Sequence, residues 1–178
     1  MAKMPPGSSL ATFAHRPEKE TTYPCSPALG RHIITKMMEK EFDVGTSKTL
    51  PSDGSEWSRD SLPHAFGFVL RQVMKDRPVP HIPVMINTFY PPNQPTAQRC
   101  HKFGQALNEA IASFPEDARV AVIASRGLSH FVVDEELDEK FLGFLQKGDV
   151  KGMTTMPEPF LQSGTSEYKN WIPVGAAA

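Results

Sequence analysis

Residues 119–130 read RVAVIASRGLSH, and this is the most informative stretch of the chain. Its first half, residues 119–124, is an apolar run of strand length, and a strand that is apolar throughout is typical of an α/β sheet covered on both faces. The second half is a turn of small residues that carries His130 past the carboxyl end of the strand, where such sheets bind ligands. Imidazole titrates near neutral pH, which suits it to proton transfer. His130 is therefore a candidate catalytic residue, and the alternative is a histidine that caps the next helix or is satisfied within its turn.

Strand and helix signals alternate on both sides of this stretch. Residues 81–89 form a second apolar run bounded by prolines, which predicts a buried strand, and a shorter strand is expected at residues 42–46. Residues 64–74 lack strand alternation and favour a short helix. Capping residues and apolar spacing predict four longer helices: one from Ser26-Pro27 to about Lys40, one after Thr96, one from Asp134 to about Gly148, and one at residues 167–174. This order of elements predicts an α/β layer structure.

Charge and composition exclude several classes of protein. The 178 residues suit one domain, and the formal net charge of −1 comes with no basic patch of the kind that binds nucleic acid. No apolar run approaches the roughly 20 residues of a membrane span, and the first ten residues lack the apolar core of a secretory signal. Cys25 and Cys100 are far apart and are expected to be reduced, part-buried thiols. These features predict a cytoplasmic protein that binds neither nucleic acid nor a membrane.

Four motifs occur in the order and spacing of a known family. They are HAFGF at residues 64–68, PHIPVMINTFYPPNQPT at residues 80–96, GLSH at residues 127–130 and LQSGTSEYKNWI at residues 161–172. With these motifs the chain resembles the catalytic, beta-type subunit of class III extradiol ring-cleavage dioxygenases, the group that includes protocatechuate 4,5-dioxygenase and gallate-type dioxygenases. The resemblance implies a three-layer α/β/α fold with a mixed sheet over residues 23–178, preceded by a loose arm at residues 1–22.

The resemblance also implies a chemistry. Enzymes of this family use O2 to cleave the ring of a catecholic aromatic acid next to the diol, with non-haem Fe(II) held by two histidines and one carboxylate. The match to residues 164–171, GTSEYKNW, implies that Glu167 is the metal carboxylate. The alternative for Glu167 is a glutamate at a helix start that the helix dipole stabilises.

Two histidines match active-site positions of the family. The GLSH match implies that His130 is the acid/base catalyst beside the substrate hydroxyls. The match around His64 implies an auxiliary catalytic group near the substrate or O2, and the alternative is a surface histidine that follows a loop. Asn87 and Thr88 end the strand predicted at residues 81–89, where they either line the pocket or form a satisfied turn.

Three features depart from the family pattern. The two metal histidines that precede the matched region in the family are not found here, and the surroundings of His15 match neither ligand motif. Arg126 stands where the family has glycine, and at positive φ an arginine costs about 1 kcal/mol or more. Pro173 falls inside the last helix and is expected to shorten or kink it. We therefore expect the N-terminal part of the family domain to be missing, and one carboxylate alone does not hold Fe(II) tightly.

The sequence thus predicts an Fe(II)-dependent extradiol dioxygenase domain of aromatic compound catabolism, in truncated form. The expected partners are a catecholic aromatic acid, O2, and a small partner subunit or a second copy of the chain. The first alternative is a non-catalytic homologue or subunit-pairing module that has lost two metal histidines. The second is a fragment of a longer enzyme. The third is an enzyme with another metal or a hydrolase, for which the sequence offers no nucleophile.

Overall fold

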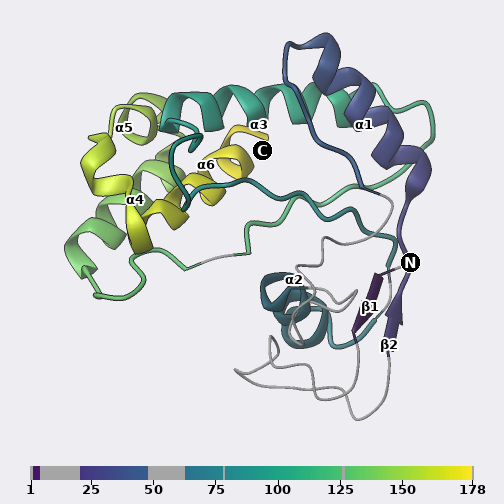
Figure 1. Cartoon of the computed structure of the whole chain (residues 1–178), viewed down its shortest axis with the longest axis horizontal. Helices are drawn as coiled ribbons and strands as arrows, with labels where there is room; N and C mark the ends of the chain where they lie inside the picture. The colour runs from purple at the N-terminus through teal and green to yellow at the C-terminus, as the bar shows by residue number, and fades with distance from the viewer. Residues whose placement is uncertain (1, 5–20, 48–62, 78, 126, 178) are drawn as a thin grey trace. The chain divides into compact units, whose positions relative to one another are not determined.

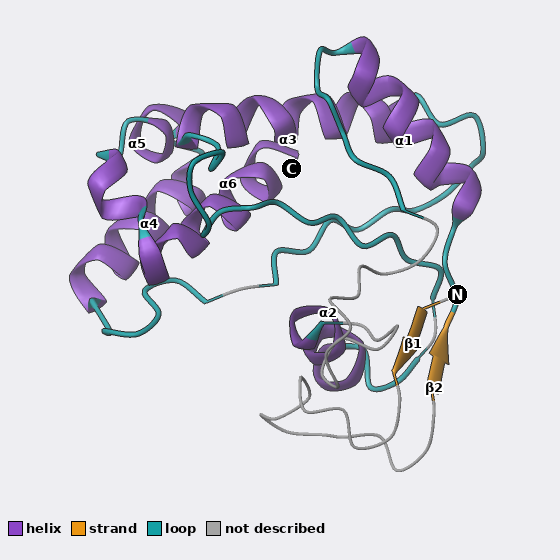
Figure 2. Cartoon of the chain, in the orientation of Figure 1, coloured by secondary structure: helices purple, strands orange, loops and turns teal. Residues whose placement is uncertain are grey.

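The computed structural model describes residues 2–4, 21–47, 63–77, 79–125 and 127–177. The chain divides into two compact units, of which unit 1 comprises Met1–Ile34 and Val44–Val84, and unit 2 comprises Thr35–Asp43 and Met85–Ala178. Figures 1 and 2 show both helices and strands, with helices predominating, so the chain is α/β at this coarse level.

Unit 1 holds the strands that the described residues contain. β1 (Ala2–Met4) and β2 (Thr21–Tyr23) pair in antiparallel register, with Ala2 opposite Tyr23. Beyond β2, Cys25 forms an isolated parallel bridge with His81. The predicted strand at residues 81–89 therefore contributes one bridge at its first residue and no longer ladder within the described residues.

The core of unit 1 gathers around Tyr23. This residue is buried together with Leu70, which lies where α2 (His64–Phe68) runs on into the π-helical segment η2 (Val69–Val73). The Tyr23 hydroxyl donates a hydrogen bond of 2.7 Å to Asp76, so the buried phenol keeps a polar partner. Residues 64–73 are helical, as the absence of strand alternation predicts.

Unit 2 is mainly helical. It contains the last residues of α1 (Pro27–Glu39), whose first residues belong to unit 1. The elements that follow in unit 2 are α3 (Ala97–Ala112), α4 (Glu135–Lys147), α5 (Val150–Thr154), the 3₁₀ segments η3 (Glu158–Leu161) and η4 (Ser163–Glu167), and α6 (Tyr168–Ala177). Their inner faces form one core, made of Ala97, Cys100, Phe141, Met153, Met156, Leu161, Tyr168 and Ile172. None of the helices in the described ranges has the length and apolar character needed to cross a bilayer.

The helix ends of unit 2 follow local signals that the sequence already carries. The Thr96 hydroxyl accepts a hydrogen bond of 3.1 Å from the Arg99 N–H at the start of α3. The Asp134 carboxylate accepts one of 3.0 Å from the Leu137 N–H at the start of α4. At the other end of α4, Gly148 takes the left-handed conformation with φ of 62°, which glycine adopts without steric cost. The cap predicted at Thr96 is confirmed, as are the helix start at Asp134 and the helix end near Gly148.

The prediction that Pro173 shortens the last helix is wrong. α6 continues through Pro173 to Ala177, because the proline removes only one backbone hydrogen bond while both Ile172 and Pro173 are buried against neighbouring elements. Gly104 of α3 lies against this point. A Cβ atom at Gly104 would come within 2.3 Å of the Pro173 carbonyl oxygen, so glycine allows the two helices to meet backbone to backbone.

The strands predicted at residues 42–46 and 119–124 are also wrong. Both segments are loops, as is the rest of the run after His81 (Figure 2). An apolar run favours burial in a sheet, but a strand also needs a second segment to complete its hydrogen-bond ladder. Within the described parts of the chain, the one sheet is that of β1 and β2. Val120 and Ile123 accordingly remain 39% and 51% exposed.

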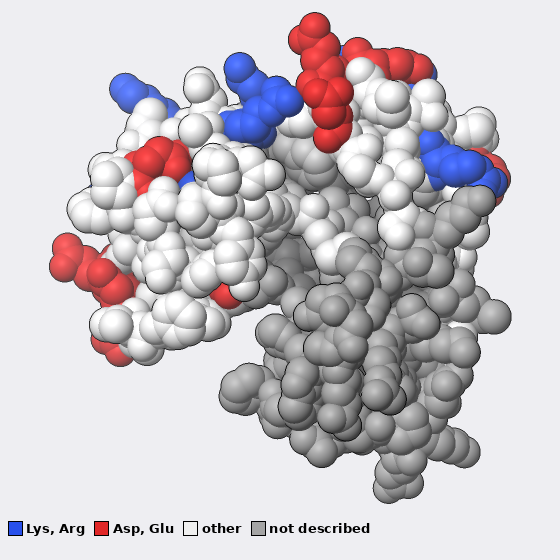
Figure 3. Space-filling view, in the orientation of Figure 1, with Lys and Arg blue, Asp and Glu red and all other residues white. Residues whose placement is uncertain are grey.

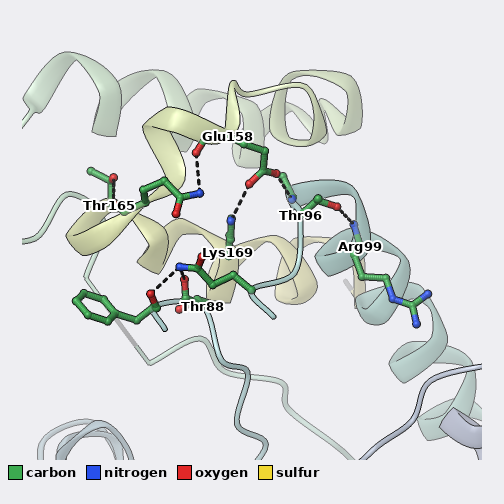
Figure 4. A network of polar contacts seen from close by, with 10 residues as sticks. Thr88, Thr96, Arg99, Glu158, Thr165 and Lys169 are labelled. Atoms are coloured by element: carbon green, nitrogen blue, oxygen red, sulfur yellow. Dashed lines mark hydrogen bonds and ion pairs between the residues drawn. The ribbon is translucent and has the colours of Figure 1, made fainter. Parts of the chain in front are cut away.

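An ion pair between a buried lysine and a part-exposed glutamate joins three elements of unit 2 (Figure 4). Lys169 of α6 is 1% exposed, and its ammonium lies 2.8 Å from Oε2 of Glu158 in η3. Oε1 of Glu158 accepts a hydrogen bond of 2.8 Å from the Ala97 N–H, at the first residue of α3. The carboxylate therefore satisfies a buried cation and a free helix N–H at once.

Most other charges lie on the surface. On the face drawn in Figure 3, acidic and basic side chains of the described residues form small separate groups of both signs. The predicted arm at residues 1–22 contains β1 and falls largely outside the described residues. Its boundary with a domain at residues 23–178 stays a prediction.

Candidate active site

Glu167 lies where η4 ends and α6 begins, and its side chain is only 8% exposed. One carboxylate oxygen, Oε2, accepts a hydrogen bond of 2.7 Å from the Gly127 N–H. The other, Oε1, lies 3.5 Å from Nε2 of His130. The structure thus brings together the carboxylate and the histidine that the sequence singled out, one from a helical segment and one from a loop far away in the chain.

His130 is the more exposed member of this pair. Its side chain is 43% exposed, and its ring packs edge-on against Phe131 with the ring centroids 4.4 Å apart. The next helix, α4, is capped by Asp134, so the alternative in which His130 caps that helix is wrong. An imidazole that has Nε2 beside a nearly buried carboxylate and is itself 43% exposed is able to exchange protons with a bound molecule.

Gly127 connects the loop to the carboxylate. Its carbonyl accepts a hydrogen bond of 3.0 Å from the Trp171 indole N–H, while its own N–H serves Glu167. A Cβ atom at this position would lie 3.3 Å from Oε2 of Glu167, a contact closer than side chains usually make. The absence of a side chain therefore lets the backbone approach the carboxylate. The neighbouring Arg126, whose effect the sequence left open, lies outside the described residues.

Ser129 is held by a second carboxylate, that of Asp138 in α4. The Ser129 N–H donates to Oδ1 of Asp138 over 2.8 Å, and its hydroxyl donates to Oδ2 over 2.7 Å. Oδ1 also accepts a short hydrogen bond from the Tyr168 hydroxyl. The serine hydroxyl in turn accepts one of 3.0 Å from the Asp134 N–H. The residue before His130 is therefore fixed through both its backbone and its side chain.

These contacts also act on protonation. Burial by itself raises the pKa of Asp138, but the hydrogen bonds from Tyr168 and Ser129 outweigh it and hold the pKa below its ordinary value. The pKa of Tyr168 is raised, first by burial and then by its bond to the Asp138 carboxylate. At neutral pH the carboxylate is therefore ionised and the phenol keeps its proton.

Sequence reasoning missed Ser129, Asp138 and Trp171 as parts of the site. Asp138 lies in an acidic helix start that the dipole alone accounts for, and its partners are 9 and 30 residues away. Trp171 stands 44 residues from Gly127, the residue that its indole contacts. No local spacing signals either contact, because both depend on how α4 and α6 pack.

The other predicted groups lie elsewhere. His64 opens α2 in unit 1, and its role beside Glu167 and His130 stays a prediction. Asn87 forms a satisfied turn, in which its amide donates to the Tyr90 carbonyl and its side-chain oxygen accepts from the Tyr90 N–H, at 2.7 and 2.9 Å. Thr88, in contrast, contacts the last helix, since its hydroxyl accepts a 3.4 Å hydrogen bond from the Asn170 amide.

The metal-binding potential of these residues is limited. Across the part of the chain that the structure describes, no three His, Cys, Asp or Glu side chains converge in a way that holds a metal ion. Glu167 and His130 supply two candidate ligands at one place. His15, the substitute that the sequence offers, is not among the described residues.

Comparison with known proteins identifies the family of the chain. The sequence profile described as the catalytic LigB subunit of aromatic ring-opening dioxygenase matches residues 7–177. The chain is also 38% identical over 125 residues to gallate dioxygenase of Pseudomonas putida, a match that covers 66% of this chain and 34% of that protein. The chain therefore spans about a third of the length of this relative. With nearly its whole length matched by that profile, the chain belongs to the family of the catalytic LigB subunit of aromatic ring-opening dioxygenases.

Proposed function

We propose that this chain takes part in the extradiol opening of a catecholic aromatic acid with O2, as an oxidoreductase. The observation that carries the proposal is the Glu167–His130 pair, in which a nearly buried carboxylate lies 3.5 Å from a half-exposed imidazole. In this proposal Glu167 is the metal carboxylate, His130 the acid/base catalyst and His64 an auxiliary polar group. Family membership and the likeness to gallate dioxygenase support it.

His130 is suited to receive a proton from a substrate hydroxyl. As a neutral imidazole it accepts the proton, and the negative charge of Glu167 stabilises the imidazolium that forms. The Gly127 N–H occupies Oε2 of Glu167, which leaves Oε1 toward the ring. Because 43% of the His130 side chain is exposed, an aromatic substrate can reach the pair.

Fe(II) is the metal that this chemistry calls for, held by two histidines and a carboxylate. The described residues do not fit it by themselves, because with His130 as the acid/base catalyst they provide one proposed ligand, Glu167, where the ion needs three. We therefore propose that further ligands come from outside the described residues, with His15 the first to test, or from a partner. A small partner subunit or a second copy, together with the complete three-layer α/β/α fold, belongs to the same proposal.

The direct test measures iron and oxygen together. The full chain is purified without oxygen, Fe(II) is added, and bound iron is measured alongside O2 uptake with protocatechuate and gallate. We expect Glu167→Gln to lower bound iron, and His130→Gln to retain iron and lower kcat by roughly 10²–10⁴-fold. His101→Gln, on a partly exposed stretch of α3, is the matched histidine control and keeps both values.

A non-catalytic or subunit-pairing role is the second candidate. The observation that favours it is the lack of three converging metal ligands in the described part of the chain. A folded chain with neither bound iron nor O2 uptake, alone and after addition of a segment that carries two metal histidines, would support this role. Uptake that appears only with the added segment would instead support the dioxygenase proposal.

A further inference from the structure

The two residues of the candidate pair are each next to a residue that binds the same carboxylate. His130 follows Ser129, and Glu167 precedes Tyr168. Both Ser129 and Tyr168 donate hydrogen bonds to Asp138. Asp138 itself contacts neither member of the pair in the hydrogen bonds and ion pairs described above.

We propose that Asp138 is a positioning residue that sets the distance between His130 and Glu167. It does so by holding the neighbouring residue of each, through the backbone and hydroxyl of Ser129 on one side and the hydroxyl of Tyr168 on the other. We call these three residues the Asp138 bridge. The inference rests on the proposed function for its catalytic meaning, since it takes His130 and Glu167 as the reacting pair.

The geometry of the loop explains why this bridge matters. The loop at residues 127–130 is attached at one end by Gly127, which forms hydrogen bonds with both Glu167 and Trp171. At its other end the attachment is Ser129, through three hydrogen bonds of 2.7 to 3.0 Å. His130 extends from this second end, so loss of the bridge allows it to rotate about Gly127 and away from Glu167.

The position of Asp138 makes it a firm support. It lies in the first turn of α4, and its own N–H donates to the Asp134 carbonyl over 2.9 Å. Tyr168 of α6, which donates to the Asp138 carboxylate, is fully buried against Phe141 of α4, with ring centroids 4.7 Å apart. A rigid helix therefore carries the carboxylate, and a packed ring carries its donor, which is how a precise site is held in place.

The test separates positioning from folding by variant and by readout. Asp138→Ala removes the acceptor of three donors, whereas Asp138→Asn keeps one oxygen acceptor and adds an amide that donates to the free lone pair of the serine hydroxyl. Tyr168→Phe removes only the hydrogen bond between Asp138 and the residue that follows Glu167. Tyr90→Phe removes a hydroxyl from an exposed ring outside the bridge and is the control.

The readout is the NMR signal of the His130 ring in the full chain labelled with ¹³C,¹⁵N-histidine, assigned with His130→Gln. We expect Asp138→Ala and Tyr168→Phe to shift or split this signal, while the signals of His32 and His101 stay in place. Asp138→Asn should restore a single signal, and Tyr90→Phe should leave all of them unchanged. Urea unfolding of each variant measures the accompanying change in stability.

An unchanged His130 signal in folded Asp138→Ala or Tyr168→Phe protein would overturn the proposal, whatever the loss of stability. If Asp138→Ala does not fold, the comparison of Tyr168→Phe with Tyr90→Phe decides alone. The readout needs no turnover, so a chain without dioxygenase activity still tests the bridge. In an active assembly, the displaced histidine should lower kcat by roughly 10²-fold and leave KM for the diol nearly unchanged.

Discussion

At the scale of single residues, Glu167 both lies at a helix start and faces a second candidate site residue. It stands directly before the first residue of α6, where a helix dipole favours negative charge. It also faces His130 and accepts the Gly127 N–H. A nearly buried carboxylate requires such partners, because an ionised group that loses water without hydrogen bonds is very costly. The position at a helix start is thus compatible with a place in the site.

Glu167 should therefore tolerate one substitution and not another. We expect Glu167→Gln to unfold in urea close to the wild-type midpoint, since the amide oxygen still accepts from the Gly127 N–H. Glu167→Ala leaves that N–H unpaired and should lose about 1–3 kcal/mol of the free energy of unfolding. Equal losses in the two variants would show that the Gly127 hydrogen bond contributes little.

Cys100 gives a second prediction at this scale. Burial raises the pKa of its thiol to about 12 from an ordinary value of 9.0. The native state thus keeps a proton that the unfolded state releases, so this contribution to stability is complete below about pH 9 and declines as pH rises toward 12. At pH 8 the native thiol should resist alkylation far longer than the part-buried Cys25, as mapped by mass spectrometry. Equal labelling rates in folded protein would contradict it.

At the scale of elements, the packing of α3 on α6 depends on one small residue. Gly104 meets the Pro173 carbonyl, and backbone atoms move less readily than the end of a side chain. The same contact helps to keep α6 helical through its proline. Helix propensity alone disfavours both residues, so tertiary packing outweighs it here.

A pair of glycine substitutions tests this contact. Gly104→Ala should destabilise the chain by roughly 1–3 kcal/mol, because the added methyl forces the helices apart. Gly143→Ala is the matched control in α4, where a Cβ meets nothing within 4 Å, and it should stabilise by about 0.5–1 kcal/mol. Thermal and urea unfolding measure both. A neutral Gly104→Ala would mean that the two helices separate without cost.

At the scale of the whole molecule, some exposed apolar side chains lie on loop segments that pair with no strand within the described residues. Val120 and Ile123 belong to such a segment in unit 2, and each is more than a third exposed. Apolar surface of this kind is typical of proteins that associate, and free backbone groups beside it favour pairing with another chain.

The isolated chain should therefore self-associate as its concentration rises. Ile123→Lys places a charge on the loop and should return the protein to monomer in size-exclusion chromatography with light scattering. Met38→Lys removes a similarly exposed apolar group from α1, whose backbone bonds are internal, and should leave the association unchanged. A chain that stays monomeric at all concentrations would contradict this prediction.

The success of sequence reasoning varied with the range of the interaction concerned. The cap at Thr96 and the ends of α4 near Asp134 and Gly148 were identified correctly, because a helix end depends on residues three or four positions away. The strand predicted at residues 119–124 was wrong, since a strand must pair with a second segment and the apolar run does not specify that segment. Pro173 was misjudged for the same reason, because the packing that keeps its helix intact comes from α3.

By itself, the sequence determined the family, the helices with their caps, and Glu167 and His130 as the residues of interest, all of which follow from motifs and local spacing. Only the tertiary structure decided that these two side chains meet, that Gly127 and Trp171 fix the carboxylate, and that Asp138 holds the residues beside both. The physical reason is distance along the chain. A cap or an apolar stripe is local, whereas a contact between residues many positions apart exists only once α4 and α6 have packed into one core.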